Sequence, residues 1–276
     1  MRIIRTGVPS GNPNLPTLNL SPAEQAIQAI PGLSLWLEGE SPGRTFYVRD
    51  SAGAFAAWVC RRTGRRFLPI GAAVPIIGAA GARRPLQFGY GPGLTGSANG
   101  RLRAEGLAPM LGTGKMTTVA LVRLPTSVSP VLNAGGYYVG SNAAAFYGLA
   151  TGIGGNQLIV SIQGAGRINY AGGAMGNGQW RLVVHSHDAD ANVGVLRIDG
   201  ATAVTSTTQT FDNVADAAVP IIGGTGIDGA TTPMVGQHFG ALHIQGLALA
   251  DPANAAHLSA VESYFGAHRA ALNAAL

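Results

Sequence analysis

The C-terminal third of the chain alternates apolar, β-branched runs with tight polar turns, and this alternation constrains the fold more than any other feature. Residues 180–185 read Trp-Arg-Leu-Val-Val-His, and a polar stretch at 188–194 follows them. The next run, at 195–198, ends on Asp199-Gly200, a dipeptide typical of two-residue hairpin turns. Strands joined by such turns pair in antiparallel fashion. This part of the chain is therefore predicted to form antiparallel β-sheet.

The same pattern extends over most of the sequence. Glycine accounts for 41 of 276 residues, as expected when many short strands are joined by tight turns. Hydrophobic residues make up 46%, enough for a sizeable core, which excludes a disordered chain. Residues 71–114, rich in Gly, Ala and Pro, are predicted to form long irregular loops, and residues 253–272 a helix. Strands are predicted at 33–37, 46–48, 57–60, 67–70, 116–124, 136–140, 145–151, 157–163, 166–170, 180–186, 193–199, 202–211, 219–223 and 236–249.

Residues 1–31 are predicted to form an extended N-terminal arm that includes one short helix. Several prolines before residue 20 fix the backbone and remove hydrogen-bond donors. Residues 21–24 read Ser-Pro-Ala-Glu, a capping box that predicts a helix over 22–30. The arm has too little apolar surface to fold alone, so we expect a neighbouring subunit to hold it. Packing as a strand on its own domain, residues 32–276, is the alternative.

Composition excludes several other classes of protein. The single cysteine, Cys60, excludes an internal disulfide framework and a cysteine-based zinc site. No apolar run approaches the roughly 18 residues of a membrane-spanning helix. Residues 1–5 are followed by Gly, Pro and Asn instead of the apolar centre of a signal peptide. We therefore expect a protein made in the bacterial cytoplasm without a signal peptide and without a membrane span.

Positive charge is concentrated early in the sequence. Residues 1–103 hold twelve arginines against four acidic residues, whereas residues 104–276 hold six basic against nine acidic residues. This asymmetry indicates that one region faces an acidic partner, and a neighbouring subunit is favoured over a solvated rim. Nucleic acid is disfavoured because the arginines match no nucleic-acid motif and lack interleaved aromatic residues. The predicted partner-binding residues are Arg2, Arg5, Arg61, Arg62, Arg65 and Arg66.

Several short motifs occur in an order that resembles the concanavalin A-like lectin/glucanase group, with its laminin-G-like jelly roll. They are Leu33-Ser-Leu-Trp-Leu-Glu38, Trp58-Val-Cys-Arg-Arg-Thr-Gly-Arg65, Asn99-Gly-Arg101, Trp180-Arg-Leu-Val183, Asp199-Gly200, Gly240-Ala-Leu-His-Ile244 and Glu262-Ser-Tyr-Phe265. The resemblance, to domains of this kind in phage and phage-like particle surface proteins, implies an all-β antiparallel jelly-roll sandwich. One departure is Arg103-Ala-Glu-Gly106, where the group usually has Phe-Asp-Gly after the Asn-Gly-Arg element. Members include sugar-binding modules, virion surface proteins and some glycan hydrolases, so function has to be argued from sites.

A group of aromatic and amide residues in the middle of the chain suggests a glycan contact. Aromatic faces cover the apolar surfaces of sugar rings, and amides orient hydroxyl groups. Aromatic residues that alternate along strands can equally belong to the core, and this alternative stays open. The predicted glycan-binding residues are Tyr137, Tyr138, Asn142, Tyr147, Asn156 and Tyr170.

Calcium is the one cofactor for which the sequence offers a pattern. Asp188, Asp190 and Asn192 place oxygen-bearing side chains at alternate positions, and Asp199 follows eleven residues after Asp188. Calcium prefers six to eight oxygen ligands. A plain polar turn is the alternative and is favoured, because no glycine stands at the sixth position. The nearby His185 and His187 share one strand face and are predicted to be a half-buried pair rather than metal ligands.

Hydrolysis of a glycan would require two carboxyl groups roughly 5–10 Å apart. Glu38 and Glu40 alternate, but they lie at a predicted strand end and are interpreted as solvated, so we predict no enzymatic activity. The favoured function is a structural or decoration protein of a phage or phage-like particle, on its capsid, spike or tail surface. The N-terminal arm would bind neighbouring virion subunits in a homo-oligomer, with a trimer as the expected number. A stand-alone carbohydrate-binding lectin-like module is the alternative, and a glycan hydrolase is third.

Overall fold

A computed structural model describes residues 20–70, 74–88, 101–105, 114–124, 132–138, 146–151, 158–162, 166–170, 177–207, 219–223 and 236–276. For 132–138, 146–151, 158–162, 166–170 and 219–220 the description is limited to the backbone. The helices are α1 (Pro22–Gln28), η1 (Pro252–Asn254) and α2 (Ala255–Asn273). The strands are β1 (Leu33–Glu38), β2 (Tyr47–Arg49), β3 (Phe55–Val59), β4 (Arg66–Ile70), β5 (Ile76–Ile77), β6 (Leu86–Phe88), β7 (Arg101–Ala104), β8 (Lys115–Arg123), β9 (Leu132–Tyr138), β10 (Phe146–Thr151), β11 (Leu158–Ile162), β12 (Gly166–Tyr170), β13 (Trp180–Asp188), β14 (Val193–Ile198), β15 (Ala201–Ser206), β16 (Val219–Ile222) and β17 (Gly236–Gln245).

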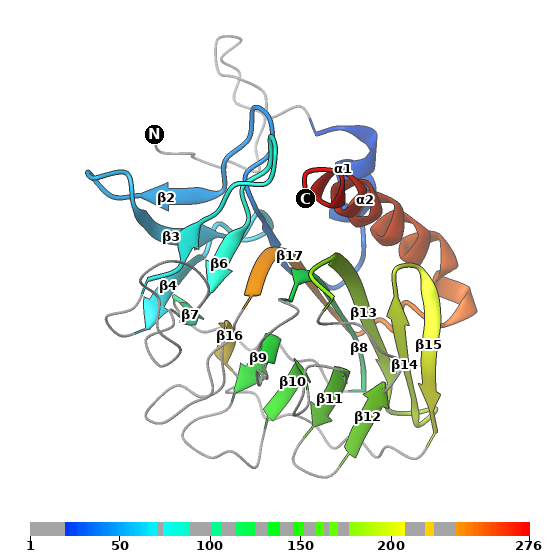
Figure 1. Cartoon of the computed structure of the whole chain (residues 1–276). Helices are drawn as coiled ribbons and strands as arrows, with labels where there is room; N and C mark the ends of the chain where they lie inside the picture. The colour runs from blue at the N-terminus through cyan, green and yellow to red at the C-terminus, as the bar shows by residue number, and fades with distance from the viewer. Residues whose placement is uncertain are drawn as a thin grey trace, which may run out of the picture.

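These strands form two antiparallel sheets. The eight-stranded sheet runs β15-β14-β13-β8-β17-β6-β5, and β1 also pairs with β17, beside β6. The nine-stranded sheet runs β12-β11-β10-β9-β16-β7-β4-β3-β2. Figure 1 shows α1 and α2 on one side of β13 and β17, with β9 to β12 on the other side. The molecule thus has three layers: helices, the eight-stranded sheet and the nine-stranded sheet.

The centre of the eight-stranded sheet is buried on both faces, which explains the continuous apolar run from Val119 to Val122 in β8. In β8, Ala120 and Val122 belong to the core between the two sheets. Val119 and Leu121 alternate with them and pack under α2 with Phe265. A strand covered on both faces has apolar residues at every position rather than at every second one. The strong apolar pattern at 116–124 therefore indicates a central strand.

The hairpin between β14 and β15 confirms the turn predicted from Asp199-Gly200. Ile198 pairs with Ala201, so the loop has two residues. Asp199 and Gly200 have φ values of 56° and 90°. Positive φ at both loop positions is the geometry whose twist matches that of the flanking strands.

Helix α1 begins where the capping box predicts. The Ser21 side chain accepts a hydrogen bond from the Glu24 N–H, and the Glu24 carboxylate accepts one from the Ser21 N–H at 2.8 Å. Ile27 and Ile30 are buried in the core that α2 also covers. The anchoring role of residues 1–31 stays a prediction, because residues 1–19, with Arg2 and Arg5, lie outside the described part of the chain.

The prediction of irregular loops over residues 71–114 is wrong for the three segments that form strands, whereas residues 71–73, 89–100 and 106–113 lie outside the described part of the chain. β5, β6 and β7 lie in this range, and β7 is a central strand of the nine-stranded sheet. β5 and β6 have only two and three residues, too few for a period to be visible.

No helix within the described residues is long and apolar enough to span a membrane.

Candidate functional site

The outer face of the nine-stranded sheet carries three arginines on two adjacent strands, β4 and β7. Phe67 of β4 and Ala104 of β7 pair with each other and lie in the core between the sheets. Alternate residues of a strand point to opposite faces. The face opposite the core therefore carries the intervening residues, which are Arg66, Leu68 and Ile70 of β4 and Arg101 and Arg103 of β7. We call these five residues the arginine face.

Two of these arginines are presented to solvent. Arg66 and Arg103 are both exposed, and within the described residues neither is in an ion pair. Leu68 pairs with Arg103 and Ile70 pairs with Arg101, and both aliphatic residues are partly exposed. The face thus combines positive charge with exposed aliphatic carbon.

The arginine face has defined neighbours. Among the described residues, Glu105 is the acidic residue next to it, since its N–H donates to the Arg66 carbonyl at 2.7 Å. On the other side of β7, Arg103 pairs with Ile221 of β16, which is fully buried although it lies on the same face. The exposed surface described here therefore ends at β7.

The turn that connects β3 with β4 is fixed from inside the molecule by Arg61. Its backbone N–H donates to the Trp36 carbonyl at 2.7 Å, and its guanidinium lies 3.8 Å from the centroid of the Trp36 ring. The guanidinium forms ion pairs with Glu24 of α1 and Glu38 of β1. It also donates to the Tyr264 hydroxyl of α2 at 2.9 Å. One buried side chain thereby ties α1, β1, α2 and the turn together.

The ionisation of this network follows from its contacts. Burial raises the pKa of the Glu38 carboxyl, while Arg61 and the hydrogen bond from Tyr264 act in the opposite direction. Burial also disfavours the charged form of Glu24, but hydrogen bonds from Arg61 and Ser21 outweigh it and lower the pKa of that carboxyl. Burial and the Glu38 carboxylate raise the pKa of Tyr264, which keeps the proton it donates to Glu38 at 2.6 Å.

Of the predicted partner-binding arginines that the structure describes, one is buried and three are exposed or partly exposed. Arg61 is buried and its guanidinium is engaged with Glu24 and Glu38, so its prediction as a surface contact is corrected to an internal role. Arg62 and Arg66 are exposed, and Arg65 is partly exposed. The sequence-based prediction does not include Arg101 and Arg103, because it places residues 71–114 in loops, although Arg-Leu-Arg-Ala is an alternating strand pattern.

The strand register places the predicted glycan-binding tyrosines on two different faces of the nine-stranded sheet. Tyr137 pairs with Tyr147 and with Pro220, and Pro220 lies on the same face of β16 as the core residue Ile222. Tyr138 lies on the opposite face of the sheet. Tyr170 pairs with Leu158, which pairs with Thr151 and so places Tyr170 on the face of Tyr147. Asn142 and Asn156 lie outside the described residues, and glycan contact by this set stays a prediction.

The predicted calcium ligands do not converge. The turn that contains Asp188 and Asn192 lies at one end of β14, and Asp199 follows its other end. Six strand residues separate the two ends by roughly 20 Å. Asp188 accepts hydrogen bonds from the N–H groups of Asp190 and Ala191 and pairs with Lys115 at 2.8 Å.

The Asp199 carboxylate also has protein partners of its own. Its carboxylate pairs with Arg181 at 2.6 Å and with Arg269 of α2, and it accepts the Leu182 N–H. Among the described residues, no three His, Cys, Asp or Glu side chains gather as a metal site. A single calcium site built from these four residues is therefore wrong, and the turn at 188–192 is a polar turn.

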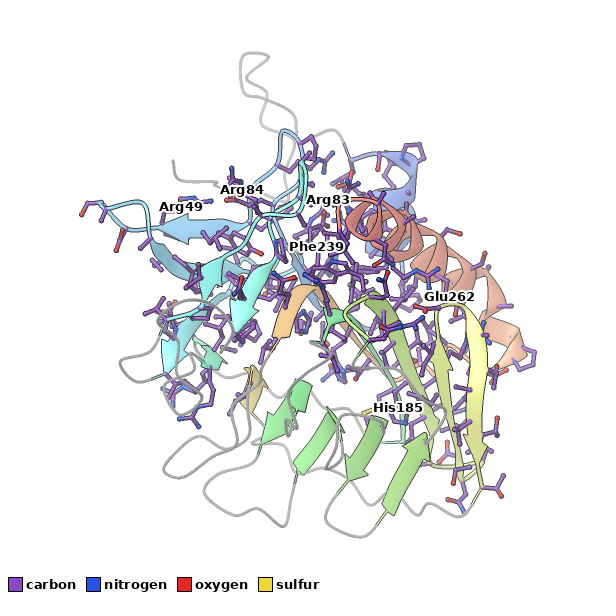
Figure 2. The ribbon with its side chains drawn as sticks, viewed as in Figure 1. Arg49, Arg83, Arg84, His185, Phe239 and Glu262 are labelled. Carbon is purple, nitrogen blue, oxygen red and sulfur yellow. The ribbon has the colours of Figure 1, made fainter. Side chains whose placement is uncertain are left out.

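A second charged cluster lies on the surface around Glu40. Arg49 donates to the Glu40 carboxylate at 2.7 Å, and Thr45 donates to it at 2.6 Å. Arg84 is 3.7 Å from the same carboxylate, with its side chain 56% exposed. Figure 2 shows Arg49 and Arg84 on the same side of the molecule. The Glu40 carboxylate thus forms ion pairs with both Arg49 and Arg84, and the interpretation of Glu40 as solvated is corrected.

His185 and His187 lie deeper in the interior than the half-buried pair that the sequence predicts. Both are buried, and their rings stack with centroids 6.3 Å apart. His185 lies two residues after the inter-sheet core residue Val183 in β13 and therefore shares its strand face. Burial, with the neighbouring His187, lowers the pKa of His185 to about 3. Burial lowers the pKa of His187 to about 4.

Comparison with known proteins identifies the fold. No protein-family model matches the sequence, and no curated protein matches it. Domain 4 of AbnA, a GH43 extracellular arabinanase from Geobacillus stearothermophilus, in complex with arabinotriose, matches with a TM-score of 0.55 at 13% identity, over 82% of this chain and 97% of that one. A receptor binding domain matches with a TM-score of 0.55 at 9% identity, over 87% of this chain and 53% of that one.

A third solved structure, the binding domain of botulinum neurotoxin DC in complex with SialylT, matches with a TM-score of 0.50 at 10% identity, over 85% of this chain and 52% of that one. The present chain spans about half the length of these last two chains. Such low identities show the fold alone. They confirm the predicted antiparallel β-sandwich, and α2 is the predicted C-terminal helix.

Proposed function

We propose that this protein is a non-catalytic, lectin-like carbohydrate-binding module. The observation that carries the proposal is the match between this β-sandwich and almost the whole of an arabinanase domain solved with arabinotriose. The neurotoxin binding domain, of the same fold, is in complex with SialylT. Because fold does not fix function, the arginine face supplies the second support: it is an exposed surface of mixed polar and aliphatic character.

The positions of the carboxylates favour binding over hydrolysis. A glycosidase requires two carboxyl groups that reach the same sugar bond. Glu38 is 1% exposed and bound to Arg61 and Tyr264, and Glu40 is bound to Arg49 and Thr45. Both residues of the pair considered from sequence thus have structural partners.

A binding experiment tests the proposal. The purified chain is applied to an array of neutral and acidic polysaccharides, and hits are titrated by calorimetry. We expect saturable binding to at least one polysaccharide without release of reducing ends. Failure to bind any polysaccharide would refute the module, and release of reducing ends would refute its non-catalytic character.

A role as a structural or decoration protein of a phage-like particle is the second candidate. The proline-rich residues 1–19 and the early excess of arginine favour it, since both suit contact with a neighbouring subunit. Deletion of residues 1–19 should then abolish homo-oligomers, seen as a change in mass by light scattering. A chain that is monomeric with and without these residues would rule this role out.

A further inference from the structure

The arginine face places three positive charges at a regular spacing. Arg101 and Arg103 are two residues apart on β7, which separates them by about 7 Å. Arg66 is a diagonal neighbour of Arg103 across the β4–β7 pair, at about 7–8 Å. Glu105 is the one acidic residue beside them among the described residues. The face therefore has a net positive charge spread over two strands.

Such a surface suits a ligand with repeated negative charges. A single exposed arginine–carboxylate contact contributes roughly 0–1 kcal/mol, too little to hold a small monovalent anion. Several such contacts along one chain add, because each further contact forms within an already bound molecule. The planar guanidinium also fits the two oxygens of a carboxylate or sulfate better than an ammonium does.

The residues between the arginines distinguish a polysaccharide from a nucleic acid. Proteins that bind single-stranded nucleic acid place aromatic rings against the bases. On this face the described residues that lie opposite Arg103 and Arg101 are Leu68 and Ile70, which are aliphatic and partly exposed. Aliphatic carbon can cover the C–H surface of a sugar ring but offers no ring for base stacking.

We propose that the arginine face binds an anionic polysaccharide, whose carboxylate or sulfate groups pair with Arg66 and Arg103 while its sugar rings lie on Leu68 and Ile70. This inference rests on the proposed function and names the ligand class and the surface. It assigns no role to the tyrosines of β9, β10 and β12.

The test compares polygalacturonate and heparin with neutral arabinan and a single-stranded oligodeoxynucleotide, by calorimetry. The variant Arg66→Gln/Arg103→Gln should lose about tenfold in affinity for the acidic polysaccharide, as two exposed charged contacts of about 0.7 kcal/mol each imply. Arg84→Gln is the matched control, because it removes one exposed charge outside this face and should leave affinity unchanged. Raising NaCl from about 50 to about 300 mM should weaken wild-type binding through screening.

The possible outcomes separate the proposed binding surface from the proposed function. Arabinan bound in preference to both acidic polymers would overturn the inference while leaving the carbohydrate-binding function. Acidic binding that the double variant retains would also overturn it, since another surface would then be responsible. Oligonucleotide binding lost in the double variant, without polysaccharide binding, would assign the face to nucleic acid. No polysaccharide binding at all would refute the proposed function itself. An unchanged melting temperature shows that the double variant is folded.

Discussion

At the scale of single residues, Arg61 shows how the same residue type takes opposite roles a few positions apart. Arg62 and Arg66 are exposed, whereas Arg61 is enclosed by Trp36, Glu24 and Glu38. Sequence could predict an arginine-rich turn after the Trp58 strand, because that motif is local. It could not predict which arginine points inward, because its partners come from α1, β1 and α2, up to 203 residues away.

Removal of Arg61 should destabilise the fold strongly. Arg61→Ala leaves Glu38 buried without its guanidinium partner, whereas Glu24 keeps its ion pair with Arg44. Removing one partner of a buried ion pair typically costs about 3–5 kcal/mol. Arg62→Ala, the exposed neighbour, should change the free energy of unfolding by no more than about 0.5 kcal/mol. Urea denaturation of both variants measures the difference. Equal and small changes would contradict the internal role of Arg61.

Gly32 is a position that no side chain can occupy. Its φ is 72°, and a Cβ added there would overlap the backbone carbonyl oxygen of Gln245 in β17. Gly43 has nearly the same φ, 73°, but no atom within 4 Å of an added Cβ. Gly43→Ala should therefore cost about 1–2 kcal/mol for the left-handed backbone alone, and Gly32→Ala clearly more. Similar midpoints in urea for the two variants would argue against the close approach of β17.

At the scale of elements, predictability followed strand length and local pattern. The strand at 116–124 is rich in β-branched residues, the strand at 180–186 contains the apolar run Leu-Val-Val, and the turn between β14 and β15 has its own sequence signature. β5 and β6 are set by pairing with β17 and with each other, a long-range cause that sequence periodicity does not carry. Because β7 lies in the same range and is not predicted as a strand, its candidate site residues Arg101 and Arg103 are not predicted either.

The turn between β13 and β14 should be insensitive to calcium. Asp188 is satisfied by Lys115 and two backbone N–H groups, and Asp199 lies at the far end of β14. Neither millimolar CaCl₂ nor EDTA should shift the melting temperature by more than about 1 °C, since a ligand stabilises only by binding the folded state. A calcium-dependent rise that Asp188→Asn abolishes would contradict the described geometry.

At the scale of the whole molecule, burial of histidines should make the fold sensitive to mild acid. Burial lowers the pKa of His185 to about 3, and that of His187 to about 4 even though Asp188 raises it. Burial, with Arg83 and Arg61, also lowers the pKa of His268 to about 4, although Glu24 raises it. The unfolded chain takes up these protons near pH 6.5 and the folded chain does not. Stability should therefore fall as pH decreases from about 6.5, by up to about 1.4 kcal/mol per pH unit for each histidine.

Thermal melts between pH 7.5 and 5.5 measure this effect. The melting temperature should decrease toward pH 5.5, and His185→Gln should make the decrease smaller because one titrating group is removed. A melting temperature that stays constant or rises on acidification would show that these histidines are not held neutral in the folded protein.

The central claim is that one face of this β-sandwich, built from β4 and β7, recognises acidic polysaccharide. Amide chemical-shift mapping on isotope-labelled protein during titration with oligogalacturonate locates the contact directly. We predict that the largest shifts fall on residues 66–70 and 101–105. Shifts confined to α2 or to the β14–β15 hairpin, with none on β4 and β7, would contradict the account.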